Sequence, residues 1–343
     1  MRLGVLTGGG DCPGLNAAIR AVIRRANVTY TDDVVGFRDG WQGVVEDDAI
    51  PLDVEACRGI LPRGGTLIGT SRFNPCKLDG DAERARETIE RRGIDALVAI
   101  GGEGTLGAAR DLADIGAPVV GVPKTIDNDV GGTDVTIGFH TAVQIATDAI
   151  DRLHTTAESH DRVIVCEVMG RNAGWIAVYA GLAGGAAVVL VPEEPFDITA
   201  VCDHLKRRHA KGRFASVVVV AEGAKPVEGT IPLPPPEIDA FDHERLGGIS
   251  AVVAREIEAR IGLEARVTIL GHVQRGGTPS AFDRVLATRL GVAAVDEVHT
   301  GTFGTMVGVR GPEIRAVSLA EALAFLKRVP TDLIDQVAGI FTD

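Results

Sequence analysis

The sequence has few cysteines, and none lies in a spacing that would hold a metal or form a redox pair. Its five cysteines are an odd number, and no two of them make a C-x-x-C pair. This usage is typical of a reducing compartment and does not favour a zinc site or a disulfide framework. The apolar stretch that follows Arg2 is also too short for the core of a signal peptide. We therefore expect a cytoplasmic protein.

Positive charge is also scarce. The chain has 35 lysines and arginines against 47 aspartates and glutamates, which gives a formal net charge of −12. Surfaces that bind nucleic acid carry clustered lysine and arginine, so we expect no nucleic-acid partner. An anionic substrate would need a local basic pocket. The candidates for it are Arg72, Lys124, Arg162, Arg171, Arg266 and Arg275.

A long uninterrupted apolar run is missing too. The nearest approach is residues 172–192, which carry no charge and come close to the ~20 apolar residues that cross a bilayer. Glycines interrupt this stretch, and Glu193 follows it directly. The pattern predicts an alanine-rich helix followed by a strand, and no membrane partner.

What the sequence does contain is an alternation of apolar runs and helix-like segments, which predicts parallel sheets flanked by helices. A length of 343 residues exceeds the usual span of one core and predicts two α/β domains. A helix is predicted over Leu15–Ala26, and the proline-rich residues 225–245 are predicted to form an extended loop. The predicted buried strands are residues 3–6, 96–100, 119–122, 163–165, 188–191, 217–220 and 267–270.

Glycine-rich turns follow two of these strands. The segment GGEGT, Gly101–Thr105, lies between a strand and a helix, where free backbone amides can meet a phosphate. Gly8–Gly10 occupies a second turn of this kind, although a glycine turn alone is often structural. Glu103 beside a phosphate would be repulsive unless a cation such as Mg²⁺ lay between them. The alternative is a carboxylate that only favours the helix N-terminus.

A carboxylate-rich turn, PKTIDND, follows at Pro123–Asp129. Asp127 and Asp129 could accept a proton from a sugar hydroxyl and help to organise a metal. Alone, such residues would more often form an Asx-turn or a cap. Together with the glycine turn they predict phosphoryl transfer.

Two later segments each present an arginine beside glycine after an apolar strand. They are EVMGRNAGW, Glu167–Trp175, and GHVQRGGTPSAFDR, Gly271–Arg284. Positions after strand ends in an α/β protein favour ligand contact, so both segments suit the binding of phosphate.

The ordered motifs resemble those of the 6-phosphofructokinase family over nearly the whole chain. They run GVLTGGGDCPGLNAAIR, GTSRF, GGEGTLGAAR, PKTIDNDVGGTD, TIGFHTA, EVMGR, AEGA and LGHVQRGGTP. The resemblance implies an α/β fold of two Rossmann-like, three-layer α/β/α domains with mainly parallel sheets. It implies a domain for the phosphoryl donor and Mg²⁺ from residues 1–138 plus 272–322. The sugar-phosphate domain would comprise residues 139–271 plus 323–343.

The resemblance also implies the activity and the roles of individual residues. ATP would phosphorylate the 1-hydroxyl of fructose 6-phosphate, giving fructose 1,6-bisphosphate and ADP in glycolysis. Asp127 would be the base, assisted by Thr125, Arg72 and Arg171. The residues at the donor would be Gly10, Arg72, Phe73, Gly102, Glu103, Gly104 and Thr105, with Glu103 on Mg²⁺. Those at fructose 6-phosphate would be Thr125, Ile126, Asp127, Met169, Gly170, Arg171, Glu222, His272, Val273, Gln274 and Arg275.

Arg162 and Arg266 resemble residues that reach the substrate site of a neighbouring subunit, which implies a homotetramer with shared active sites. Two positions indicate different phosphoryl donors. Gly104 resembles ATP-dependent members, and Lys124 resembles pyrophosphate-dependent ones. We favour ATP, because an aspartate at the glycine position would exclude ATP whereas a lysine can tolerate it. Pyrophosphate is the alternative donor. A non-catalytic sugar-phosphate sensor and an NAD or lipid kinase are further alternatives.

Overall fold

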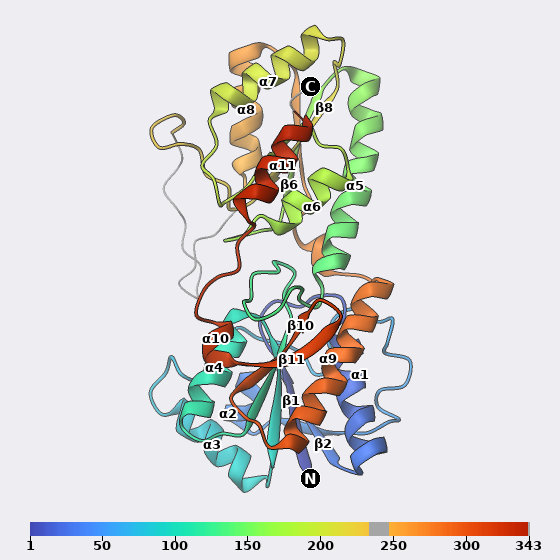
Figure 1. The fold of residues 1–343 in the computed structure, drawn as a ribbon, viewed down its shortest axis with the longest axis vertical. Coiled ribbons are helices and arrows are strands. Elements are labelled where there is room, and N and C mark those ends of the chain that lie inside the picture. The colour runs from blue at the N-terminus through green and yellow to red at the C-terminus, as the bar shows by residue number, and fades with distance from the viewer. Residues whose placement is uncertain (233–246, 342–343) are drawn as a thin grey trace. The chain divides into compact units, whose positions relative to one another are not determined.

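The computed structural model describes residues 1–232 and 247–341, and the chain divides into two compact units. Unit 1 contains Met1–Thr141 and Arg275–Lys327, and unit 2 contains Ala142–Gln274 and Arg328–Asp343. Each unit is therefore built from two separate stretches of the chain. Each is an α/β fold with a sheet flanked by helices, as predicted (Figure 1).

Unit 1 is built on a seven-stranded sheet in the order β11-β10-β5-β4-β1-β2-β3. Its inner strands are parallel, and the two edge strands β3 and β11 are antiparallel to their neighbours. The strands are β1 (Arg2–Thr7), β2 (Asp33–Phe37), β3 (Ala49–Leu52), β4 (Ala96–Gly101), β5 (Val119–Pro123), β10 (Thr305–Arg310) and β11 (Glu313–Ser318). The helices are α1 (Leu15–Arg24), the π-helix η1 (Arg25–Tyr30), α2 (Trp41–Glu46), α3 (Asp81–Arg91), α4 (Glu103–Asp114), α9 (Ala281–Thr300) and α10 (Leu319–Ala322).

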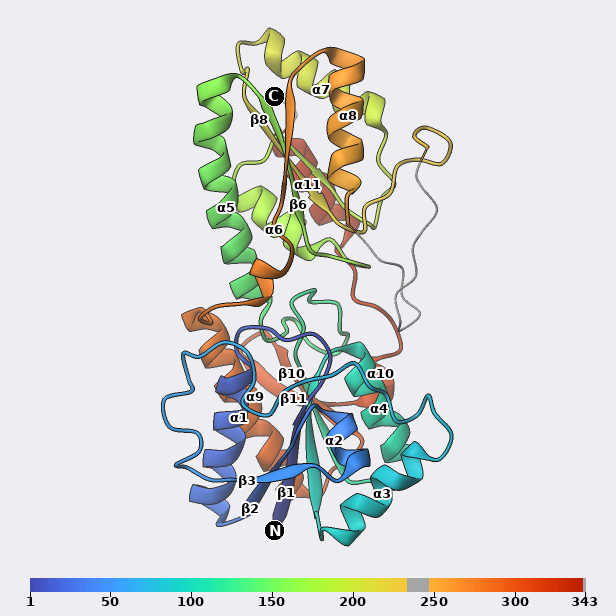
Figure 2. The ribbon, with the colours of Figure 1, turned by 180° about the vertical axis from the view of Figure 1, so that it is seen from behind.

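Helices cover both faces of this sheet. Helices α1 and α9 lie on one face, and α2, α3, α4 and α10 on the other (Figures 1 and 2). The core beneath α2, α3 and α4 includes fully buried Phe37, Trp41 and Leu97. Between β1 and β4 the strand order changes direction, which is the place where open α/β sheets bind ligands.

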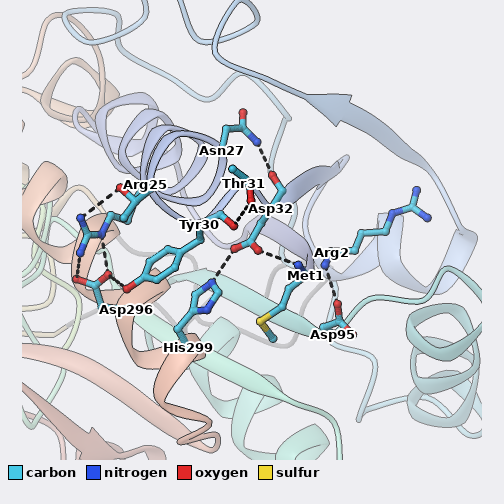
Figure 3. A network of polar contacts seen from close by, with 11 residues as sticks. Met1, Arg2, Arg25, Asn27, Tyr30, Thr31, Asp32, Asp95, Asp296 and His299 are labelled. Carbon is cyan, nitrogen blue, oxygen red and sulfur yellow. Dashed lines mark hydrogen bonds and ion pairs between the residues drawn. The ribbon is translucent and has the colours of Figure 1, made fainter.

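Helix α1 is shorter than predicted. Its α-helical part ends at Arg24, and the chain continues as the π-helix η1. Figure 3 shows what holds this wider turn: the Arg25 guanidinium and the Tyr30 hydroxyl both donate to the Asp296 carboxylate of α9, at 2.7 and 2.9 Å. The Tyr30 ring also stacks on His299, with ring centroids 3.6 Å apart. These contacts fix α1 to α9 at one end of the sheet.

Unit 2 is built on a four-stranded parallel sheet in the order β7-β8-β6-β9. Helices α7 and α8 lie on one face, and α5 and α6 on the other (Figures 1 and 2). The strands are β6 (Val163–Val168), β7 (Val188–Leu190), β8 (Ser216–Ala221) and β9 (Ala265–Ile269). The helices are α5 (Phe139–His160), α6 (Trp175–Ala183), α7 (Ile198–Ala210), α8 (Ile249–Ile261), the 3₁₀ turn η2 (Gly271–Arg275) and α11 (Thr331–Phe341).

Every predicted apolar run forms a strand, but one of them is not buried. In β9, Val267 is 38% and Ile269 is 55% exposed, because this strand lies at the edge of the sheet. The uncharged segment forms the helix α6 and the strand β7, as predicted. Within the described ranges, no helix is long and apolar enough to cross a bilayer. Most of the predicted proline-rich loop, its residues 233–245, lies outside the described residues.

Candidate active site

The glycine turns and the carboxylate turn meet at the carboxyl ends of β1, β4 and β5. Gly8 N donates to Ile100 O at 3.0 Å, and Lys124 N donates to Gly101 O at 2.9 Å. These bonds join neighbouring strands of the parallel sheet just beyond their ends. Segments far apart in sequence are thereby brought to one edge, as the order of strands and motifs suggested.

Thr105 fixes how closely the first turn of α4 approaches these loops. Its side chain is 6% exposed and lies between two glycines. A Cβ built on Gly8 would lie 2.5 Å from Thr105 Oγ1, and one on Gly101 would lie 2.3 Å from Thr105 Cβ. Only glycine leaves room for this packing. The side chain of Thr105, a predicted donor contact, therefore fills the gap between the turns.

The N-terminus of α4 is open to a ligand. Gly102 is the N-cap residue in an extended conformation, and Glu103 and Gly104 in the first turn are exposed. The first amides of a helix lack partners inside the helix and carry a partial positive charge, which favours anions. Among the described residues, no heavy atom outside the helix backbone lies within 4 Å of a Cβ built on Gly104. A larger side chain there would meet open space.

The buried side chain of Lys124 supports the first glycine turn by hydrogen bonds. The side chain is 1% exposed, and its ammonium donates to Gly8 O at 2.9 Å and to Gly10 O at 2.6 Å. Burial lowers the pKa of this lysine, because the interior disfavours its charged form. The side chain predicted to contact the donor is therefore also a support for the loop.

Arg275 lies on the same glycine turn, in unit 1. Its guanidinium donates to Asp11 O at 3.2 Å, and a Cβ built on Gly10 would lie 2.6 Å from Arg275 Nη1. Gly10 thus allows the guanidinium to lie against the main chain. The sequence placed Arg275 among the sugar-phosphate residues, and the structure places it beside a predicted donor residue.

The other predicted donor residues lie next to this turn. Gly9 N donates to Ser71 O at 2.8 Å, which brings the segment of Arg72 and Phe73 beside the glycines. Phe73 packs against the core of unit 1 and Arg72 is exposed. The aromatic ring therefore anchors the segment, and the guanidinium remains accessible to a ligand.

The carboxylate turn is held by its own polar side chains. Asp127 N donates to Thr125 Oγ1 at 3.2 Å, and Thr136 Oγ1 donates to Thr125 O at 2.6 Å. Asn128 has a φ of 52° and accepts from Thr136 N at 3.1 Å through its buried side-chain oxygen. Between these residues Ile126 is fully buried, whereas Asp127 is half-buried. The turn presents Asp127 while its neighbours point into the protein.

Three carboxylates lie near one another at this edge. Burial, together with the negative charges of Asp127 and Glu103, raises the pKa of Asp129 to about 7. The described residues contain no group of three or more His, Cys, Asp or Glu side chains arranged to hold a metal on their own. Mg²⁺, however, commonly takes one or two carboxylates together with substrate phosphates and water. The exposed carboxylate of Glu103 fits such a role.

In unit 2, the EVMGR segment is held to the end of β8 by main-chain bonds. Glu222 N donates to Val168 O at 2.9 Å, and Gly223 N donates to Gly170 O at 3.1 Å. Gly170 has a φ of 142°, and a Cβ built on Gly223 would lie 2.0 Å from Arg171 O. The glycines therefore allow Glu222 and Arg171 to lie on adjacent loops.

Gln274 joins the GHVQR turn to the same edge of the sheet. Its buried amide accepts from Met169 N at 3.4 Å and donates to Gly271 O at 3.1 Å. His272 and Val273 in this turn are exposed. The predicted sugar-phosphate residues Met169, His272 and Val273 are thus brought together, and Gln274 serves the fold.

Arg162 and Arg266 lie elsewhere, near the amino ends of β6 and β9. Arg162 Nε lies 2.8 Å from a Glu264 oxygen, and Arg266 also pairs with Glu264. The hydrogen bond from Arg162 lowers the pKa of the Glu264 carboxyl. Since β6 spans six residues at about 3.3 Å each, these arginines lie far from the loop of Met169. They do not join the other predicted residues within this chain.

Three groups with a clear supporting role were not singled out from the sequence. Glu167 is buried and accepts from Ser250 N at 3.0 Å and Ser250 Oγ at 2.6 Å, which caps the start of α8. Asn128 and Lys327 support the carboxylate turn. A buried strand residue such as Glu167 could have been noticed as an acidic residue inside an apolar run. Lys327 gives no such signal.

Taken by itself, unit 1 has the fold and site of a phosphate-binding α/β protein. Its glycine turns, open helix start and carboxylates lie at the switch point of a mainly parallel sheet. Proteins of this class bind phosphorylated ligands at that position.

The chain belongs to the phosphofructokinase family, whose sequence profile matches residues 2–298. It is 58% identical to pyrophosphate–fructose 6-phosphate 1-phosphotransferase of Streptomyces coelicolor over 342 residues, 99% of each chain. It is 57% identical to ATP-dependent 6-phosphofructokinase 3 of the same organism over 330 residues, 96% of this chain and 97% of the relative. The expected family is confirmed.

Solved structures agree on the fold. The phosphofructokinase of Pichia pastoris in the T-state superposes with a TM-score of 0.83 at 33% identity over 99% of this chain. This chain spans 36% of the length of that yeast chain. The pyrophosphate-dependent phosphofructokinase of Marinobacter aquaeolei gives a TM-score of 0.84 at 23% identity, covering all of this chain and 92% of the other. The second likeness concerns the fold alone.

Proposed function

We propose that the protein transfers the terminal phosphoryl group of ATP to the 1-hydroxyl of fructose 6-phosphate, as a 6-phosphofructokinase of glycolysis. The products are fructose 1,6-bisphosphate and ADP. One observation carries the proposal: the open start of α4, the Glu103 carboxylate and the Asp127 turn lie at one edge of the unit 1 sheet. The names of the two Streptomyces relatives, both of which specify phosphorylation of fructose 6-phosphate or a phosphofructokinase, support it.

In this proposal the chain mainly aligns groups and neutralises charge. Phosphoryl transfer has a loose transition state, so positioning and electrostatics supply most of the catalysis. Asp127 takes the proton from the attacking hydroxyl, and Thr125 orients the turn that carries it. Glu103 would hold Mg²⁺, whose positive charge would offset that of the donor phosphates. Arg72 binds donor oxygens from its exposed position.

Residues 1–138 plus 272–322 are proposed to bind the donor and Mg²⁺, with Gly10, Phe73 and Gly102–Thr105 at the donor. Residues 139–271 plus 323–343 are proposed to bind the sugar phosphate. Arg171 supports this role, because a guanidinium can hold phosphate oxygens by two hydrogen bonds. Met169, Gly170, Glu222 and His272 complete the sugar-phosphate contacts in the proposal.

ATP is the favoured donor. The names of relatives do not separate ATP from pyrophosphate, since both occur at 57–58% identity. Two structural features support ATP instead. Gly104 leaves open space in the first turn of α4, within the described chain. Lys124, the residue that suggested pyrophosphate, already donates to two main-chain oxygens of the glycine turn.

Pyrophosphate remains the second candidate donor, because the Lys124 ammonium lies directly beneath that turn and still adds positive charge there. The deciding experiment supplies ATP and pyrophosphate in separate reactions with Mg²⁺ and fructose 6-phosphate. Turnover with ATP alone supports the proposal. Turnover with pyrophosphate alone gives the decisive role to Lys124. Binding of fructose 6-phosphate without turnover by either donor indicates a sugar-phosphate sensor.

A cytoplasmic homotetramer with shared substrate sites is part of the proposal. Arg162 and Arg266 lie away from the loops of their own unit, as residues serving a second copy would. The exposed Val267 and Ile269 on the edge strand offer apolar surface for such a contact. Light scattering of the purified protein tests the mass. Recovery of activity when an Asp127→Ser protein is mixed with an Arg162→Ala protein tests the sharing.

A further inference from the structure

Lys327 sits at the end of the last stretch of unit 1, and its side chain turns back toward the carboxylate turn. Its ammonium donates to Asn128 Oδ1 at 3.0 Å, to Thr133 O at 3.0 Å and to Asp134 O at 2.9 Å. A lysine ammonium has three donors on one atom, so it can join acceptors that converge on a point. Here they come from a segment about 200 positions earlier in the chain.

The main chain next to Lys327 makes the same connection. Lys327 N donates to Asp129 O at 2.8 Å, and Leu326 forms an antiparallel bridge with Val130. The carboxyl side of the turn is therefore fixed by the backbone as well as by the ammonium. Both kinds of contact hold the residues that follow Asp127 in the chain, whereas Thr125 precedes it.

Asn128 links these contacts to the other side of the turn by hydrogen bonds. It has a φ of 52°, a conformation that asparagine tolerates better than most residues but that still needs support. Its side-chain oxygen accepts from both Lys327 Nζ and Thr136 N. Thr136 Oγ1 in turn donates to Thr125 O at 2.6 Å. A chain of hydrogen bonds thus runs from Lys327 to Thr125 and brackets Asp127.

The charge on Lys327 also matters at this position. Burial lowers the pKa of this lysine to about 8, while the negative charges of Asp134 and Asp129 act in the opposite direction. An ammonium that is partly desolvated is costly unless it is paired and hydrogen-bonded. A simple loop closure could be made by an apolar side chain without that cost. The convergence of three oxygens on the ammonium suggests that the charge serves the turn.

We propose that Lys327 is a positioning residue for phosphoryl transfer, which holds the Asn128 side chain and thereby the conformation that presents Asp127. The inference rests on the proposed function of Asp127 as the base. Lys327 need not touch the substrate to act in this way. Its loss would change the rate of the chemical step more than the binding of either substrate.

The first test replaces Lys327 by Met and by Arg, with exposed Lys77→Met as the matched control. We expect kcat to fall by up to about 10²-fold in Lys327→Met, because a small misplacement of a reacting group costs that much. KM for fructose 6-phosphate and for ATP should change by less than about threefold. Arg should recover the rate only partly, since a planar guanidinium cannot direct three donors to the same convergent oxygens. Lys77→Met should match the wild type.

In these single variants, two results would overturn the proposal. One is a kcat of Lys327→Met, corrected for the folded fraction, within twofold of the wild type. The other is full recovery by Arg, because that would mean that charge alone is needed. A double-mutant cycle with Asn128→Gly, which tolerates the same φ but lacks the acceptor, checks the route. Additive losses would show that Lys327 does not act through Asn128.

A second measurement separates this inference from the proposed function. Hydrogen exchange of peptides covering residues 125–136 needs no substrate. We expect Lys327→Met to speed exchange there by about tenfold or more, because Thr136 N donates to the side chain that Lys327 holds. Unchanged exchange overturns the positioning role even if the wild type is active. Faster exchange in a protein whose wild type does not phosphorylate fructose 6-phosphate supports the role in the turn and refutes the function.

Discussion

The loops of unit 1 and of unit 2 are held in shape by different kinds of group. In unit 1, Lys124 and Lys327 each donate from a buried or half-buried ammonium to several oxygens of the loops. In unit 2, the EVMGR loop is tied by main-chain bonds such as Gly223 N to Gly170 O and by the neutral amide of Gln274. The difference corresponds to the side chains that the loops of each unit present. Closely spaced carboxylates need nearby positive charge, whereas loops that present arginine need only a fixed backbone.

This comparison predicts different responses to substitution. Removing a buried cation leaves the oxygens that it paired without a partner, which is expensive in a region of low dielectric. Adding an atom to a glycine loop instead displaces the backbone. The first kind of change should affect unit 1 and the donor, and the second should affect unit 2 and the sugar phosphate.

The largest effect is expected at the group that unit 1 presents. Asp127→Ser should lower kcat by about 10²- to 10⁴-fold, because it removes the proposed general base. Binding of fructose 6-phosphate, measured by calorimetry, should persist. Asp114→Ser, which changes an exposed carboxylate at the end of α4, is the control and should keep the wild-type rate. Near-normal turnover of Asp127→Ser would refute the assignment of the base.

The next effect tests the backbone scaffold of unit 2. In Gly223→Ala, the added Cβ would lie 2.0 Å from Arg171 O, so the Arg171 loop must move. Overpacking of this kind costs about 1–3 kcal/mol, which we expect mainly as a raised KM for fructose 6-phosphate. Gly107→Ala is a suitable control, since within the described residues nothing outside the helix backbone lies within 4 Å of its Cβ. If the KM for the donor rose instead, the division of roles between the units would be wrong.

A third change tests whether Lys124 supports the loop or selects the donor. Lys124→Met keeps an unbranched apolar stem out to Cε but removes the ammonium that donates to Gly8 O and Gly10 O. A hydrogen bond from a charged group is worth about 1.5–3 kcal/mol, a factor of about 10 to 150, and we expect the lower end of that range as a rise in the KM of whichever donor is used. Steady-state kinetics with ATP and pyrophosphate measure it. A loss confined to pyrophosphate, with the ATP reaction untouched, would show that Lys124 acts on the donor and not through the loop.

The two regions also differ in how far the sequence predicted them. The apolar runs predicted β1, β4 and β5, and the two turns that carry Glu103 and Asp127 were predicted together as a site of phosphoryl transfer. The antiparallel hairpin of β10 and β11 was missed. Charged residues interrupt the apolar pattern of β11, whereas the uncharged run of β10, residues 306–309, could have been noticed. The exposure of β9 was missed because a run of apolar residues does not reveal whether a strand lies at the edge of its sheet.

Support from distant residues was the part that sequence could not supply. Lys327 lies in a short segment, FLKRVP, whose basic residues would normally be assigned to the surface. Its contact with Asn128 spans 199 positions of the chain and lies within unit 1, which is built from two separate stretches of sequence. No local pattern records such a contact. The motifs themselves could be located in the sequence, because each follows a predicted apolar strand.

The smallest predicted effect concerns the pH dependence of stability at the carboxylates of unit 1. Burial and the charge of Asp127 raise the pKa of Asp129 from 3.8 to about 7. Between these values the folded protein keeps a proton that the unfolded chain has lost, so raising the pH favours unfolding. This stabilising contribution is therefore present below about pH 4 and is lost as the pH rises to about 7. Asp129→Asn, which does not titrate, removes the dependence.

We therefore expect the Tm of Asp129→Asn relative to the wild type to be higher at pH 8 than at pH 5, with calorimetry in Mg²⁺-free buffer as the measurement. Each kcal/mol corresponds to about 2–4 °C for a domain of this size. Asp114→Asn, on the exposed end of α4, should give a Tm difference that does not depend on pH. A difference for Asp129→Asn that shrinks toward pH 8 would mean that nearby positive charge, such as that of Lys327, outweighs burial at this carboxylate. In that case the lysines of unit 1 would influence the pKa of its carboxylates more strongly than the comparison with unit 2 implies.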